Sequence, residues 1–138
     1  MKKIAISVFA LALATCAFAQ KKNVNAAEGK LYEPKDLVGA QSLIEKAMVN
    51  PETSGQARTF MVAAQVYENI YLEEETKRQM NGDFNQARVN EALVKAADAY
   101  KVASELDVKP NEKGQIKPKY VKNIPGKIET LKNYLIKK

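Results

Sequence analysis

The chain has 138 residues, a formal net charge of +6 at pH 7, one cysteine, and neither histidine nor tryptophan. The absence of histidine removes the usual nucleophile and base pairs of hydrolases, and the lone cysteine cannot supply a zinc or haem site. The six glycines are scattered, so no phosphate-binding loop is present. These exclusions favour a protein that is not an enzyme and that holds no metal and no cofactor.

The N-terminal segment has the features of a targeting signal. Two lysines precede residues 4–19, an uncharged apolar run that ends in the small-x-small triplet AFA. The run is shorter than the ~20 residues of a spanning helix, which predicts a signal peptide over 1–19 and export to the periplasm or cell envelope. One alternative is a lipoprotein lipidated at Cys16, although Thr15 stands where a smaller residue is usual. The other is an uncleaved anchor.

A first helix is predicted after a lead-in. Residues 20–34 have little apolar content and no periodicity, so we expect them to be flexible. Apolar residues then recur at helical spacing until Pro51, which predicts a helix over 35–49 that begins at Asp36 or at the turn of Pro34. Its apolar stripe comprises Leu37, Ala40, Ile44, Ala47 and Met48.

A second, longer helix is predicted over 54–79. Thr53 and Gln56 have the spacing of a capping box at its start. Val62 and Val66 add apolar character beside the main core stripe, which predicts a helix packed between neighbours on two sides. The main stripe comprises Phe60, Ala63, Ala64, Tyr67, Ile70 and Tyr71.

The C-terminal half of this helix is strongly charged. Glu73 with Lys77 and Glu74 with Arg78 have the i,i+4 spacing and order that favour ion pairs on an exposed face. Consecutive carboxylates on a helix point in different directions, so the run Glu73, Glu74 and Glu75 predicts a solvated face rather than a cation site.

A third helix is predicted over 83–106. Asn81 and Gly82 tolerate positive φ, and Asp83 offers an N-cap. Small residues one turn before and after Tyr100 allow a neighbouring helix to approach while the ring fills the remaining space. The stripe comprises Leu93, Ala96, Tyr100, Ala103 and Leu106.

The C-terminal region is basic. From position 109 to the end there are nine lysines against Glu112 and Glu129. Residues 109–124 are predicted to form a basic linker, and residues 125–138 an amphipathic helix with the apolar seam Ile128, Leu131 and Leu135. We expect this seam to pack back on the third helix, with homo-oligomer formation as the alternative. The lysines of this basic tail are Lys117, Lys119, Lys122, Lys127 and Lys132.

Two of these patterns, in this order, resemble the two helices of a tetratricopeptide repeat. The first is Phe60-x-x-Ala63-Ala64-x-x-Tyr67, and the second is Ala96-x-x-x-Tyr100-x-x-Ala103-x-x-Leu106. The resemblance implies an all-α fold in which antiparallel helix hairpins over 35–108 stack as a short right-handed solenoid. It also implies that the residues of these two patterns make the repeat-packing contacts.

The resemblance implies a function as well. In that family the first helices of the repeats line a groove that takes peptides or other proteins. This implies a protein-protein interaction module of the bacterial cell envelope, with partner-groove candidates Arg58, Met61, Gln65 and Asn69. The alternative is an electrostatic tether that binds anionic membrane or envelope polysaccharide through the lysine-rich C-terminus. Nucleic acid is disfavoured because export separates the protein from it. A further alternative is a remnant of a longer repeat protein.

Overall fold

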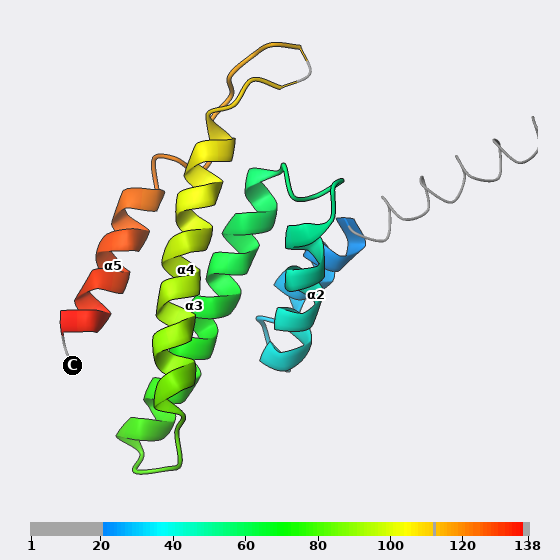
Figure 1. Ribbon diagram of the computed structural model, residues 1–138. Helices are drawn as coiled ribbons and strands as arrows, with labels where there is room; N and C mark the ends of the chain where they lie inside the picture. Colours follow the sequence, from blue (N-terminus) through cyan, green and yellow to red (C-terminus); the bar gives the residue numbers. More distant parts are fainter. Residues whose placement is uncertain (1–20, 112, 137–138) are drawn as a thin grey trace, which may run out of the picture.

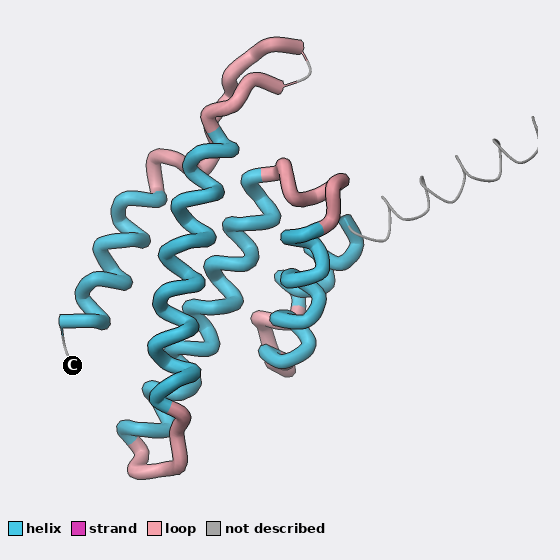
Figure 2. Tube along the Cα trace, in the orientation of Figure 1, coloured by secondary structure: helices cyan, strands magenta, loops and turns pink. Residues whose placement is uncertain are grey.

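The computed structural model describes residues 21–111 and 113–136 of the chain. Within these ranges the regular secondary structure is helical and no strand occurs, so the all-α prediction is confirmed (Figures 1 and 2). Residues 21–29 are helical, and four further helices follow: α2 (Leu37–Val49), α3 (Ala57–Gln79), α4 (Gln86–Asp107) and α5 (Ile124–Ile136). The predicted signal peptide over 1–19, including Cys16, lies outside the described residues. None of the described helices is long and apolar enough to cross a membrane.

The helices lie side by side in a row, with α3 and α4 as an antiparallel pair at its centre (Figure 1). The helix α2 packs on α3, and α5 packs on α4. The short helix over 21–29 lies beside α2 and connects to it through residues 30–36 (Figure 1). The described part of the chain thus forms two helix hairpins in succession, followed by one further helix.

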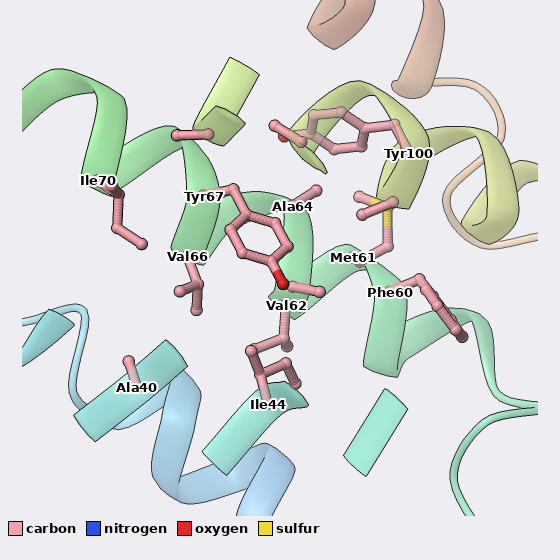
Figure 3. Packing of buried hydrophobic residues seen from close by; sticks show 14 of the residues in the cluster. Ala40, Ile44, Phe60, Met61, Val62, Ala64, Val66, Tyr67, Ile70 and Tyr100 are labelled. Carbon is pink, nitrogen blue, oxygen red and sulfur yellow. The ribbon is translucent and has the colours of Figure 1, made fainter. Parts of the chain in front are cut away.

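The central helix α3 is buried on two sides, as its sequence predicts. On one side Val62 and Val66 face α2, and Figure 3 shows Val62 directed toward Ile44. On the other side Tyr100 of α4, which has no exposed surface, fills the interface (Figure 3). Burial of these side chains is the main contribution to the stability of the stack.

The N-terminal lead-in over 20–34 differs from the prediction of a flexible segment. Residues 21–29 form a helix, and Val24, Ala27 and Leu31 are buried in the same core as α2 and α3. These three residues follow helical steps of three and four, and they gain enough by covering their neighbours to order a polar segment. The prediction of flexibility is therefore wrong for this helix.

Two of the three predicted helix caps are also wrong. Asp36 does cap α2, because its Oδ1 accepts a hydrogen bond of 2.9 Å from the backbone N–H of Gly39. Thr53, however, is buried, and its hydroxyl donates at 2.6 Å to the carbonyl of Ala47 near the end of α2. Thr53 therefore adds a second hydrogen bond to a carbonyl in the last turn of the preceding helix, which the N–H of Asn50 also contacts, instead of starting the next helix.

The turn between α3 and α4 shifts the third cap by two residues. Asn81 takes the predicted positive φ, at 56°. Asn85, and not Asp83, is the N-cap of α4, since its Oδ1 accepts a bond of 3.1 Å from the N–H of Arg88. Glu74 of α3 explains this shift, because its carboxylate accepts a hydrogen bond of 2.9 Å from the backbone N–H of Asn85.

The last helix packs within the chain, as predicted, but of the predicted seam Leu131 alone is buried, Ile128 is partly buried and Leu135 is exposed. Ile124 and Leu131 of α5 are buried in the common core, while Leu135 remains 58% exposed. Asp107, the last residue of α4, fixes the approach to α5: its carboxylate accepts bonds of 2.8 to 2.9 Å from the backbone N–H groups of residues 119–121. The basic linker therefore ends in an ordered turn that is tied to α4.

Candidate functional site

The candidate site is a strip along α3 that its neighbours leave partly uncovered. Gln65, Asn69, Leu72 and Thr76 follow one another at steps of three and four and so lie on one side of this helix. Leu72 is 42% exposed, an unusual position for a leucine in the most buried helix of the fold. The strip therefore combines amide and hydroxyl groups with one exposed apolar side chain.

A shallow pocket of about 310 Å³ lies at the C-terminal half of the strip. Leu37 and Leu72 supply its apolar wall, and Asn69 and Thr76 supply hydrogen-bonding groups. Lys35, Glu73 and Lys77 form the rest of its lining. A pocket of this size and composition accommodates one or two side chains of an extended peptide.

The side chain of Asn69 is held in a defined orientation. Its Nδ2 donates a bond of 2.8 Å to the carbonyl of Gln65, one turn earlier in α3. This leaves the amide oxygen of Asn69 to accept a hydrogen bond from a ligand at the edge of the pocket. A fixed amide loses little conformational entropy on binding, which suits recognition of a peptide backbone.

The four partner-groove candidates from the sequence fall into different environments. Asn69 lines the pocket, and Gln65 is half-buried on the same strip. Met61 is only 7% exposed and belongs to the core, so it is not an accessible groove residue. Arg58 lies in the first turn of α3, and its Nη2 is 3.6 Å from Oε2 of Glu28. The helix over 21–29, which the sequence analysis missed, thus lies next to the N-terminal end of the strip.

The acidic run beside the pocket is only partly a solvated face. Glu73 pairs with Lys77 at 3.5 Å, as predicted. Glu74 is buried instead, and the backbone N–H of Asn85, together with Lys77, lowers the pKa of its carboxyl below the ordinary value. The predicted pair of Glu74 with Arg78 does not form, because Arg78 binds Glu75. Glu74 is therefore a structural link between α3 and α4.

The residues assigned to repeat packing are in the core. All of them are buried except Leu106, which is partly buried and packs against the core. Tyr67 also makes a polar contact between helices, since its hydroxyl donates a bond of 3.0 Å to Oε1 of Glu45 in α2. Burial raises the pKa of the Tyr67 hydroxyl, with the charge of Glu45 as the next cause. These residues hold the helices that present the strip and are not themselves accessible.

A second feature of the surface is an excess of unpaired lysines near the C-terminus. Lys117, Lys119 and Lys122 are exposed in the linker, and Lys127 and Lys132 are exposed on α5. None of these five forms an ion pair within 4 Å with a residue that the structure describes, whereas Lys77 and Lys95 in α3 and α4 do. Lys119 and Lys127 do interact with the charges of Asp107 and Glu68, so Lys117, Lys122 and Lys132 are the members of the basic tail that are most available to an external anion.

Over residues 21–111 and 113–136, no group of three or more histidine, cysteine, aspartate or glutamate residues is placed to hold a metal ion. The α3 strip offers amide, hydroxyl and apolar contacts. Comparisons with protein-family models, with curated proteins and with solved structures found no match to this chain.

Proposed function

We propose that this chain is a tetratricopeptide-like interaction module that binds a segment of another protein along the α3 strip and acts in the bacterial cell envelope. The observation that carries the proposal is the order of packing. Each new helix lies against the hairpin before it, and α3 keeps one accessible side although it has neighbours on both flanks. Such an arrangement is typical of helical repeat proteins, in which stacked hairpins present a continuous surface to a partner.

Three contacts support this order. Arg58 of α3 meets Glu28 in the first hairpin, and Tyr67 of α3 bonds to Glu45 of α2. The ring of Tyr134 in α5 stacks on Tyr71 of α3. The helix α5 therefore contacts both members of the hairpin that precedes it, as the first helix of a following repeat would.

The groups on the strip fit an extended polypeptide better than a small charged ligand. The fixed amide of Asn69 suits a backbone N–H, and the exposed Leu72 beside Leu37 suits an apolar side chain. Glu73 and Lys77 already neutralise each other at the rim. Lys35 is then the one remaining charge in the lining of the pocket.

Site-specific photocrosslinking tests this function. A benzoylphenylalanine placed at position 72 or 65 in the source cell should give a discrete adduct with one other protein. The same probe at position 38, on the exposed outer side of α2, is the matched control and should give none. Asn69→Ala, introduced together with the probe at 65, should reduce the adduct several-fold because the ligand loses a hydrogen bond.

Equal adducts from positions 38 and 72 would indicate random collision and contradict the proposal. So would the absence of adducts from both strip positions when the variant protein is folded and present at the normal level.

The unpaired lysines favour a second candidate function, binding of an anionic envelope surface through the basic tail. Each lysine near an anionic bilayer contributes about 1 kcal/mol at moderate ionic strength. Five lysines without an ion pair within 4 Å are gathered in residues 117–132, whereas Lys30, Arg58, Lys77, Arg78 and Lys95 elsewhere on the described surface have acidic partners.

Co-sedimentation with vesicles of anionic lipid separates this function from the first. Binding at low salt that is lost at high salt, and that a Lys117→Gln, Lys119→Gln and Lys122→Gln variant lacks, supports the tether. Binding that does not respond to salt, or no binding, contradicts it. The photocrosslinks from the α3 strip should be unaffected by these three substitutions.

A further inference from the structure

One flank of α5, beside the groove that it forms with α4, carries an apolar stripe. Ile128, Lys132 and Leu135 follow at steps of four and three and share this flank, while Leu131 points into the core. Ile128 is partly buried against the core, and Leu135 is exposed. In Figure 1, α5 is the end of the row, with α4 on its inner side. The groove between α4 and α5 is not filled by any described part of the chain.

The face contains both a projection and a hollow. The projection is Leu135, with more than half of its surface exposed. The hollow is a groove of about 430 Å³ between α4 and the first half of α5. Ser104 of α4, Val121 of the linker, and Ile128, Glu129 and Lys132 of α5 contribute to its lining.

This flank carries one charge of each sign, Lys132 in the stripe and Glu129 beside it in the lining of the groove. Glu129 and Lys132 are both exposed and lie one turn apart on α5. Although i,i+3 spacing permits a bond between them, neither forms an ion pair with any residue in the described ranges. Each charge can therefore pair with an opposite charge outside this chain.

We propose that this face binds a second copy of the chain through antiparallel pairing of the two α5 helices. A two-fold axis that crosses α5 near residue 131 places Leu135 of one copy about four residues from the axis. Ile128 of the other copy is three residues from the axis on the same side, so the two side chains start roughly 6 and 4.5 Å from the axis at 1.5 Å per residue. Leu135 of each copy then enters the groove of the other beside Ile128.

The charges support a second copy as the occupant. The same symmetry places Glu129 of one copy opposite Lys132 of the other, twice over. A face with charges of one sign would repel itself, whereas this one is complementary to its own image. The apolar contact and the two ion pairs come from the same flank, as an interface of two identical surfaces requires. The face does not include the α3 strip, so this association is separate from the proposed function.

Sedimentation velocity on protein produced from the full-length sequence tests the pairing, with the N-terminus of the purified protein determined by mass spectrometry. Between about 1 µM and 1 mM the wild type should change from monomer to dimer. Glu129→Lys or Lys132→Glu alone should weaken the dimer about tenfold or more, since each puts like charges together at two places. The double variant Glu129→Lys with Lys132→Glu restores both pairs and should return the dissociation constant to within about threefold of the wild type.

Two further variants define the face. Leu135→Asp should abolish the dimer without changing the helical content. Lys46→Glu, at an exposed position of α2, changes the charge of the molecule as Lys132→Glu does and should leave the dimer intact. A wild type that is monomeric over the whole concentration range overturns the proposal, as does a double variant that associates no better than the single ones.

Discussion

The rings of Tyr71 and Tyr134 stack with their centroids 4.7 Å apart and their planes inclined by 25°. This contact joins α3 to α5, two helices whose main connection is otherwise through α4. Offset stacking of two aromatic rings contributes about 0.5 to 1.5 kcal/mol beyond the area that they bury. The position of the last helix therefore depends on the stacking of these two rings as well as on the burial of Ile124 and Leu131.

Tyr134→Ala should lower the free energy of unfolding by about 1 to 2 kcal/mol, because the variant loses both the stacking and part of the apolar contact. Tyr134→Phe keeps the ring and should remain within about 0.5 kcal/mol of the wild type. Urea unfolding measures the difference, and hydrogen exchange should show the amides of α5 losing protection first. Uniform loss of protection across α3, α4 and α5 would contradict a local role for this pair.

Asp107 should make the junction of α4 and α5 sensitive to acid. Burial alone raises the pKa of its carboxyl, but the N–H groups of Lys119, Tyr120 and Val121 outweigh that effect, so the pKa lies below the ordinary value. A lowered pKa in the folded state means that the stabilising contribution is complete above the unfolded value of about 4. This contribution is lost as the pH falls through the folded value.

Asp107→Asn should therefore cost about 2 to 3 kcal/mol at pH 7, because an uncharged amide replaces a carboxylate that accepts several backbone bonds. The difference between wild type and variant should shrink as the pH is lowered from about 5 to 2. Chemical denaturation over this range measures it. Glu105→Gln, an exposed neighbour on α4, is the control and should change stability by less than about 0.5 kcal/mol. A constant difference at all pH values would show that the charge of Asp107 is not the cause.

The long helices were predictable because their apolar residues recur over several turns. Tyr100 with Ala96 and Ala103 defines a stripe in α4 that permits one close packing partner, and the structure buries all three. In α3 the two valines beside the main stripe indicate a second neighbour, which is α2. When apolar residues recur at helical spacing over more than twenty positions, the helix is predicted correctly even if one position does not fit the pattern.

The helix over 21–29 and the caps could not be predicted for a physical reason. The segment has only three apolar residues at helical spacing, Val24, Ala27 and Leu31, and three are too few to distinguish a short amphipathic helix from a polar coil. The helix is stable because these residues pack against neighbours that are distant in the sequence. Thr53 and Asp83 have good local cap sequences. The competing partners are distant in the chain: the carbonyl of Ala47 takes the Thr53 hydroxyl, and Glu74 holds Asn85.

The candidate site was predictable only in part. Helical spacing from the aromatic pattern placed Gln65 and Asn69 on the side of α3 that carries the candidate strip. It could not show that Met61, on the same side, is covered. The position of Leu72 in the sequence could have indicated the strip. Leu72 is an apolar residue one turn from Asn69, but it lies outside the core stripe that contains Ile70 and Tyr71.

Val24 tests whether the first helix belongs to the fold. Val24→Asp places a charge in a buried position and should lower the free energy of unfolding by about 3 kcal/mol or more. Ala26→Asp makes the same kind of change on the exposed side of the helix over 21–29 and should stay within about 0.5 kcal/mol of the wild type. Thermal unfolding compares them. Equal melting temperatures for the two variants would show that this helix does not stabilise the rest.

Tyr100 tests the packing between α3 and α4. Its side chain has no exposed surface and lies between Ala96 and Ala103, which are also fully buried. Removal of the ring leaves a cavity that two neighbouring alanines cannot fill, so Tyr100→Ala should cost about 3 to 5 kcal/mol. Tyr32→Ala removes the same ring from a position that is 67% exposed and should cost less than about 0.5 kcal/mol. Because a small domain has only about 5 to 15 kcal/mol of stability in total, the Tyr100 variant should melt far earlier or fail to fold. Circular dichroism on heating measures both variants, and a Tyr100→Ala protein that melts with the wild type would contradict the close packing of α3 on α4.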